Sequence, residues 1–434
     1  MRLSEVCIGL LKSLLRTDFD RKINSVKEKV YERLDLSADI SDEQLKAIIT
    51  ECVFEESRIN MVSIRERGLI EEAVFNAIRK LDVLQEALDD DSITEIMING
   101  YKDIFLEKNG RITRWDKSFE SDEKLADIAQ KIAAMSNRIV NASVPIVDTR
   151  LENGSRVNIV LPPVALNGPV ITIRKFYDEP LTMQKLLEFE SISEEAAEFL
   201  KNAVRAKYNI FISGGTGSGK TTFLNILSNY IPKDERVITI EDSAELQIKG
   251  VANLVRLEAR NANVEGKNAV TIRDLIRASL RMRPDRIVVG EVRGAETLDM
   301  IQAMSTGHDG SLSTGHGNSP KDMMSRLETM VLMGIDMPLA SVRQQIVSAI
   351  DIIVHLGRLR DKTRRVMQIV EIVGLKNGEI EFNPIYEFRE ESKSHEKQCE
   401  KGQEAESRVA GRLVRVGKGL YNLDKMQAAG ITAD

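Results

Sequence analysis

A glycine-rich segment, Gly-Gly-Thr-Gly-Ser-Gly-Lys-Thr-Thr at residues 214–222, stands between an apolar run at 209–213 and an amphipathic run at 221–230. It fits the pattern GxxxxGK[ST], whose glycines let backbone N–H groups turn inward around phosphate at the start of a helix. We expect Lys220, in a solvent-facing loop, to reach the β- and γ-phosphates, and the Thr221 hydroxyl to bind Mg²⁺. The predicted nucleotide-binding residues are Gly214, Gly215, Thr216, Gly217, Ser218, Gly219, Lys220, Thr221 and Thr222.

From about residue 181 the sequence alternates between helical periodicity and short apolar strands, which is typical of a parallel sheet covered by helices. The predicted helices are 199–206, 221–230 and 272–281, and the predicted strands are 209–213, 237–241 and 286–290. The fold class predicted for this part is therefore α/β.

The patterning divides the chain of 434 residues into four parts. Residues 1–88 show only helical periodicity, whereas 89–180 contain short strands, hairpin signals such as Asn99-Gly100, and one helix, typical of a smaller α+β domain. The α/β domain follows at 181–388. Residues 389–434 begin with a strongly charged stretch that predicts a solvated linker, and end in a segment too short for a core of its own.

The amino-acid composition disfavours or excludes several classes of protein. The net charge of −6 and an aromatic content of 5% disfavour a protein that binds nucleic acid along its backbone. Three scattered cysteines without a CxxC pair exclude a disulfide framework and a zinc module, and they predict a reducing compartment. No apolar run approaches the length of a membrane span and no secretory signal is recognisable, so we expect a cytoplasmic location.

Two carboxylates follow predicted strands downstream of the glycine-rich segment, Glu241 after 237–240 and Glu291 after 286–290. Ligands of open α/β sheets collect at the carboxyl ends of the strands, so both acids are expected to face the phosphates. We assign Glu241 to the attacking water and Glu291 to the metal. The alternative is that either acid caps a helix or pairs with an arginine.

A segment rich in glycine, serine and threonine, residues 306–316, contains two of the four histidines. We expect it to be flexible, with His316 sensing the γ-phosphate or orienting the catalytic glutamate. A structural hydrogen bond is the alternative for His308 and for His316. A metal site lacks a third ligand at suitable spacing.

Arg156 and Arg174 stand in predicted strands of the 89–180 domain, ahead of a short hinge at 178–180. An arginine from another domain or subunit accelerates phosphoryl transfer by neutralising charge that develops on the phosphate. Both arginines are therefore candidate catalytic residues.

Together these stretches resemble the ATPases of type II secretion, type IV pili and type IV secretion. The resemblance rests on residues 214–222, an acidic box at 239–245, Gly290-Glu291 in place of the usual Walker B aspartate, and a histidine box at 306–319. Residues 150–158 and 171–176 look like the CpaF/TadA branch, which serves tight-adherence (Flp) pili. The similarity covers about residues 83–388.

The resemblance implies a RecA-like P-loop core preceded by a smaller PAS-like α+β domain and an N-terminal helical bundle. It also implies a homohexameric ring that hydrolyses ATP with Mg²⁺ and drives pilus assembly or protein secretion. The implied partner is an inner-membrane platform protein, with the ATPase at the inner face of the cytoplasmic membrane and neither nucleic acid nor zinc bound. The alternatives are a RecA-like nucleic-acid motor and a non-hydrolysing, ATP-gated scaffold.

Overall fold

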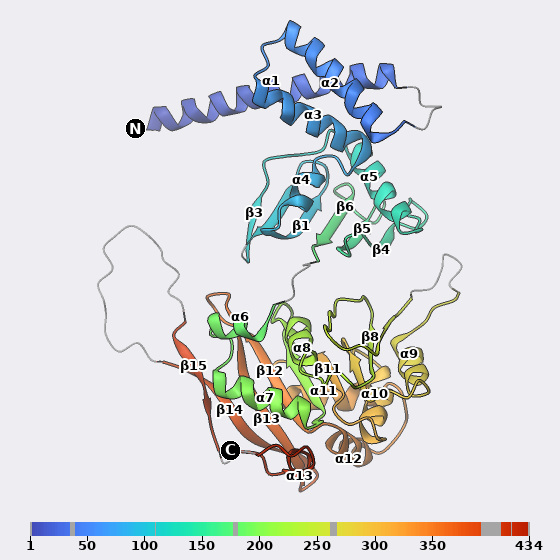
Figure 1. Cartoon of the computed structure of the whole chain (residues 1–434), viewed down its shortest axis with the longest axis vertical. Coiled ribbons are helices and arrows are strands. Elements are labelled where there is room, and N and C mark those ends of the chain that lie inside the picture. The colour runs from blue at the N-terminus through green and yellow to red at the C-terminus, as the bar shows by residue number, and fades with distance from the viewer. Residues whose placement is uncertain are drawn as a thin grey trace. The chain divides into compact units, whose positions relative to one another are not determined.

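The chain divides after Phe176 into two units, coloured blue to green and green to red in Figure 1. The computed structural model describes residues 2–34, 40–108, 110–176, 181–260, 267–391, 409–417 and 419–432, with side chains from residue 18 onward. The predicted hinge at 178–180 and most of the predicted charged linker lie outside these ranges. The predicted division into four parts stays a prediction.

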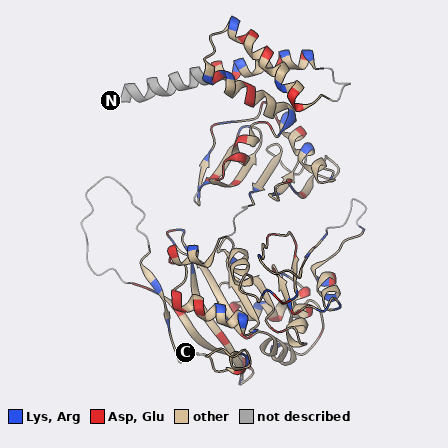
Figure 2. Ribbon diagram, in the orientation of Figure 1, with Lys and Arg blue, Asp and Glu red and all other residues tan. Residues whose placement is uncertain are grey.

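The first unit begins with three long helices, α1 (Arg2–Arg33), α2 (Asp42–Ile59) and α3 (Ile64–Arg79). Ser41 and Ser63 start α2 and α3 with reciprocal capping boxes, which satisfy backbone N–H groups at the helix ends. Apolar side chains at helical spacing form a common core between them. Acidic and basic positions are interspersed along α2 and α3 (Figure 2), as expected for solvated faces.

A six-stranded antiparallel sheet follows in the same unit, in the order β3-β2-β1-β6-β5-β4. Its buried residues alternate along the strands and pack against the two helices of this region. The predicted hairpins are present, whereas β4 was not predicted. The elements are α4 (Leu84–Asp89), β1 (Ile93–Asn99), β2 (Ile104–Lys108), β3 (Arg111–Arg114), α5 (Asp122–Met135), β4 (Ile146–Arg150), β5 (Arg156–Val160) and β6 (Val170–Arg174).

The second unit is built on a nine-stranded sheet in the order β15-β14-β13-β12-β7-β11-β10-β8-β9. The pairings from β12 to β9 are parallel and those from β12 to β15 are antiparallel. The strands are β7 (Ile210–Gly214), β8 (Val237–Glu241), β9 (Leu254–Glu258), β10 (Arg286–Val289), β11 (Leu312–His316), β12 (Ile352–Arg358), β13 (Arg364–Lys376), β14 (Glu379–Glu390) and β15 (Gly411–Arg415).

Two separate apolar cores show that helices cover both faces of this sheet. The helices α6 (Met183–Glu188), α7 (Glu194–Arg205), α8 (Lys220–Ser228) and α13 (Asp424–Ala428) contribute to one core. The helices α9 (Ile272–Ser279), α10 (Glu296–Ser305), α11 (Pro320–Leu332) and α12 (Leu339–Ala349) contribute to the other. The parallel sheet confirms the predicted α/β class. Within the described residues, no helix combines the length and apolarity that crossing a membrane requires.

Residues 312–316, at the end of the segment predicted to be flexible, instead form a central strand, β11, which lies between β7 and β10. A Cβ atom at Gly315 would lie 3.0 Å from both Met323 and Phe211, and the Thr314 hydroxyl donates to the carbonyl of Gly290. Close packing therefore requires small residues in this strand, and the expectation of flexibility is wrong for residues 312–316.

A buried ion pair joins two segments of the second unit. The Arg286 side chain is fully buried, and its Nε donates to Glu235 at 2.5 Å. Its Nη1 also donates to the carbonyls of Val204 and Gly310. Removing one partner of a buried pair leaves an uncompensated charge in the interior.

Replacing Glu235 by alanine should therefore destabilise the protein by about 3–5 kcal/mol, measured by denaturant unfolding of the full chain. The matched control is Glu198→Ala, whose exposed pair with Lys201 should contribute at most about 1 kcal/mol. Equal losses in both variants would show that the buried pair has no special role.

Candidate functional site

The glycine-rich segment forms a tight loop between β7 and α8. Gly217 and Gly219 have φ angles of +70° and +94°, in the left-handed region that glycine adopts without strain. A Cβ atom at Gly214 would lie 2.5 Å from the Ser218 hydroxyl and 2.6 Å from the carbonyl of Leu356. The loop is thus confined by its own Ser218 side chain and by the backbone of β12.

Lys220 is the first residue of α8 and is only 8% exposed, so the expectation of a solvent-facing lysine is wrong. Its ammonium donates to the carbonyl of Gly215 at 3.0 Å and lies 3.2 Å from Nδ1 of His316. An ammonium can only donate, so His316 Nδ1 accepts and the ring proton sits on Nε2.

His316 connects Lys220 to Glu291. Its Nε2 lies 3.0 Å from Oε1 of Glu291, and Arg293 Nη2 donates to the other carboxylate oxygen at 2.9 Å. Burial lowers the pKa of His316, opposed by Glu291 and reinforced by the cations Lys220 and Arg293. The ring is therefore neutral near pH 7, and it links an ammonium to a carboxylate.

Glu241 lies at the end of β8, buried and 3% exposed. Its Oε1 accepts the backbone N–H groups of Glu245 and Leu246, while its Oε2 is buried without a hydrogen-bond partner. Burial raises the pKa of Glu241, although the two backbone hydrogen bonds oppose the shift. Such a carboxylate is poorly solvated, and it is a better proton acceptor than an ordinary glutamate.

Gly290 has no side chain and so leaves space for the side chain of Glu241. It follows β10, which pairs with β8, and a Cβ atom at this position would lie 3.1 Å from the Glu241 Cγ. Gly290 and Arg293 were not predicted as site residues, although both stand in the Gly-Glu-Val-Arg stretch at 290–293.

The structure thus joins Lys220, His316 and Glu291 in one chain of contacts, with Glu241 at the end of the strand beside β10. The alternatives left open by the sequence are also visible. Glu291 pairs with an arginine, and Glu241 binds backbone N–H groups of a following turn. His308 Nδ1 lies 3.3 Å from the carbonyl of Ala303, which matches its structural alternative.

The donor set suits Mg²⁺, which uses one or two protein oxygens and completes its shell with water and substrate phosphate. Oε1 of Glu291 is buried and accepts no well-directed hydrogen bond, so this oxygen can take a hard cation. The hydroxyl of Thr221, in the first turn of α8, is the second oxygen at this end of the loop. Within the described residues, no group of three or more acidic, histidine or cysteine side chains forms a metal site on its own.

Arg156 and Arg174 belong to the first unit and lie directly opposite each other on β5 and β6. On its other side Arg174 faces Glu95 of β1. The structure therefore brings the two predicted arginines together. Their role in catalysis stays a prediction.

The chain was compared with known proteins. A family described as "Type II/IV secretion system protein" matches residues 79–420. A Mycobacterium tuberculosis protein named for conjugal transfer is 35% identical over 294 residues, which cover 66% of this chain and 83% of that protein. The type IV secretion system protein VirB11 of Brucella abortus is 34% identical over 306 residues, covering 64% and 84%. Among solved structures, the VirB11 ATPase of Brucella suis in complex with sulphate is similar, with a TM-score of 0.37 and 29% identity, over 66% of this chain and 95% of that one.

The burial of Glu241 leads to a prediction about stability. Its raised pKa means that the folded state binds a proton more readily than the unfolded chain, whose glutamates titrate near pH 4.3. The ionised side chain therefore costs stability at neutral pH. We expect Glu241→Gln to raise Tm at pH 7–8 by a few degrees, on the order of 1 kcal/mol, measured by scanning calorimetry.

The gain should shrink as pH falls through the raised pKa and vanish near pH 4. Glu258→Gln is the control, because Glu258 is exposed at the end of the neighbouring strand β9. A Tm difference that does not change with pH would contradict the assignment of a buried, ionised Glu241.

Proposed function

Because the chain belongs to the type II/IV secretion system protein family, we propose that it is a motor coupling Mg-ATP hydrolysis to pilus assembly or secretion. The family match confirms the resemblance stated from the sequence and, with it, an ATPase as the general activity. The observation that carries the mechanism is the chain of contacts from Lys220 through His316 to Glu291, which begins at the phosphate loop.

Nucleotide binding would displace Lys220 from its contacts with Gly215 and His316. Its ammonium would then meet the β- and γ-phosphates, whose negative charge strengthens the hydrogen bonds that it donates. Thr221 and Glu291 would hold Mg²⁺, which would neutralise phosphate charge when bound. His316 would then lose its contact with Lys220 and keep its contact with Glu291. The contacts of His316 would therefore differ between the phosphate-bound and the phosphate-free site.

Glu241 would orient and deprotonate the attacking water. A general base works best when its pKa approaches the working pH, and burial moves Glu241 in that direction. The carboxylate is already anchored by two backbone N–H groups through one oxygen, and the other oxygen is left for water. Gly290 provides the space for this arrangement.

Arg156 and Arg174 would complete the site from the first unit, by closing on the phosphates as charge grows on the equatorial oxygens. Release of phosphate removes that attraction and lets the units separate again, which is the proposed power stroke. The working form would be a homohexameric ring at the inner face of the cytoplasmic membrane, acting on a membrane platform protein. The CpaF/TadA branch and tight-adherence pili are the system that the sequence resembles most.

The proposal is tested by separating nucleotide binding from hydrolysis. Glu241→Gln should bind Mg-ATP as the wild type does, while turnover falls by about 10²-fold or more, because only the general base is lost. Glu291→Gln should instead weaken the dependence on Mg²⁺. Phosphate release and nucleotide titrations with varied Mg²⁺ measure both.

Lys220→Ala serves as the variant that loses nucleotide binding, and Lys201→Ala on α7 as its surface control. Wild-type hydrolysis by Lys220→Ala would overturn the phosphate-loop assignment. Identical behaviour of the two glutamate variants would overturn the division of roles. Stimulation of turnover by DNA would favour the nucleic-acid motor, and binding without any hydrolysis would favour the scaffold.

The arginines of the first unit lead to a separate prediction. Arg174→Gln or Arg156→Gln should lower kcat far more than ground-state affinity for ATP, because their contact forms only in the closed state. Specific activity should also rise with protein concentration as the ring forms, which light scattering can follow. Arg114→Gln, which breaks an exposed pair with Asp103 in the same sheet, should change neither quantity. Normal kcat in both variants would refute the coupling.

A further inference from the structure

The hairpin of β12 and β13 carries two arginines next to the phosphate loop. Arg358, the last residue of β12, and Arg364, the first residue of β13, are directly opposite each other in the strand register. Arg364 Nε donates to the carbonyl of Gly217 at 2.8 Å. A Cβ atom at Gly219 would lie 3.6 Å from Arg364 Cδ, and one at Gly217 would lie 3.9 Å from Arg358 Nη1.

Like charges directly opposite each other destabilise a strand pair. Arg358 is exposed and forms no hydrogen bond or ion pair with any residue that the structure describes. The hydrogen bond that Arg364 donates goes to a neutral carbonyl rather than to an acid. The hairpin thus presents two guanidinium groups to the phosphate loop, with no carboxylate between them among the described residues.

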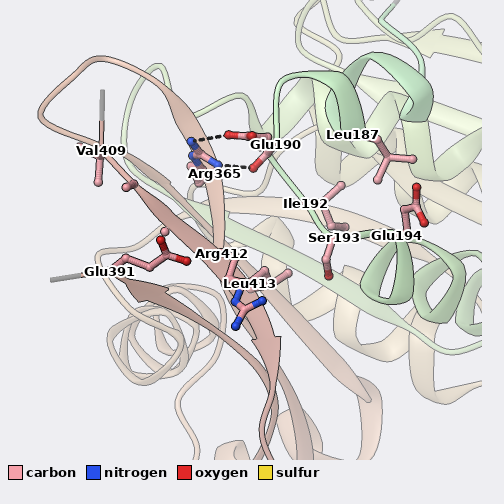
Figure 3. A pocket seen from close by; sticks show the side chains of 12 residues that line it. Leu187, Glu190, Ile192, Ser193, Glu194, Arg365, Glu391, Val409, Arg412 and Leu413 are labelled. Atoms are coloured by element: carbon pink, nitrogen blue, oxygen red, sulfur yellow. Dashed lines mark hydrogen bonds and ion pairs between the residues drawn. The ribbon is translucent and has the colours of Figure 1, made fainter. Parts of the chain in front are cut away.

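The other arginines of this hairpin have acidic partners. Arg360 pairs with Glu390, and Arg365, on the opposite face of β13 from Arg364, is buried and bonded to Glu190 (Figure 3). Arg365 lines a pocket of about 590 Å³ that also contains Glu391. Among the described residues, Arg360 and Arg365 thus have acidic partners, whereas Arg358 and Arg364 beside the phosphate loop have none.

The sheet order places these two arginines on one side of the loop. β12 flanks β7 on the side opposite β11, whereas Glu291 and Glu241 follow β10 and β8, beyond β11. In the proposed function Glu241 and Glu291 act on the γ-phosphate, so their side of the loop would be the side of the transferred phosphate. Arg358 and Arg364 therefore approach from the side of the phosphates that are not transferred.

We propose that Arg358 and Arg364 bind the α- and β-phosphates of the nucleotide, so that they set its affinity without taking part in hydrolysis. This inference rests on the proposed function of the loop. Paired guanidinium groups recognise phosphate oxygens through charge-assisted hydrogen bonds, and a shared anion removes the repulsion between them. Arg364 would exchange the Gly217 carbonyl for a phosphate oxygen.

The test uses the full chain and compares Arg358→Gln, Arg364→Gln, Arg364→Lys and the control Arg360→Gln. Isothermal titration measures Kd for ATP and for ADP, and phosphate release measures kcat at saturating ATP. Each Gln variant should weaken ATP and ADP alike, by about 10- to 100-fold, and Arg364→Lys by less. kcat should stay within about threefold, because uniform binding does not change the chemical step.

Thermal unfolding supplies a readout that a purely structural role would not give. Without nucleotide, Arg358→Gln should have a Tm equal to or above that of the wild type, because the like-charge contact is relieved. With saturating ADP its Tm should rise less than the wild-type Tm does. A lower Tm without nucleotide and unchanged Kd values would show a structural role and overturn the proposal.

The remaining outcomes are equally decisive. An unchanged Kd with a reduced kcat would place the arginines at the γ-phosphate and contradict the proposal. Equal weakening of nucleotide binding by Arg360→Gln would also contradict it. If the wild type binds and hydrolyses ATP while the Gln variants match it, this inference fails and the proposed function stands. If the wild type binds neither nucleotide, both fail.

Discussion

The ammonium of Lys220 is a full positive charge in a position that water barely reaches, and the site is organised around it. The carbonyl of Gly215 and the neutral imidazole of His316 contact it. Within this chain of contacts the carboxylate is that of Glu291, which contacts His316 rather than Lys220. In the proposed function a triphosphate would bring negative charge to this ammonium at the start of α8.

Parallel pairing brings these side chains together from distant parts of the sequence. β7, β11, β10 and β8 are consecutive neighbours, so residues that follow their carboxyl ends line one edge of the sheet. The glycines at this edge of the sheet are required because neighbouring atoms leave no room for a side chain. Gly214 faces the backbone of β12, Gly315 faces Met323, and Gly290 faces Glu241, so each position excludes a larger side chain. The spacing of charges at the site thus follows from the closeness of the strands.

The sequence alone predicted the phosphate loop, its flanking strand and helix, and the α/β class, because these depend on local pattern. It failed for β11, since glycine and serine have low strand propensity and only burial between β7 and β10 makes them a strand. It also failed for the burial of Lys220, whose contact with His316 joins residues 96 positions apart in the chain. Arg358 and Arg364 lie opposite each other because of the pairing register of the β12–β13 hairpin. The hydrophobic periodicity of the sequence does not determine that register.

Both units carry a pair of arginines directly opposite each other on neighbouring strands, Arg156 with Arg174 and Arg358 with Arg364. In the proposed mechanism the two pairs have different tasks because they belong to different units. The hairpin pair shares a unit with the loop, so its attraction for phosphate is the same in every state and contributes affinity alone. The pair of the first unit would attract phosphate only in a closed state of the proposed cycle, and a ligand shifts an equilibrium only by its differential affinity for the two states. Affinity for the nucleotide and the coupling of hydrolysis to movement can therefore be tuned separately, by residues on different strands.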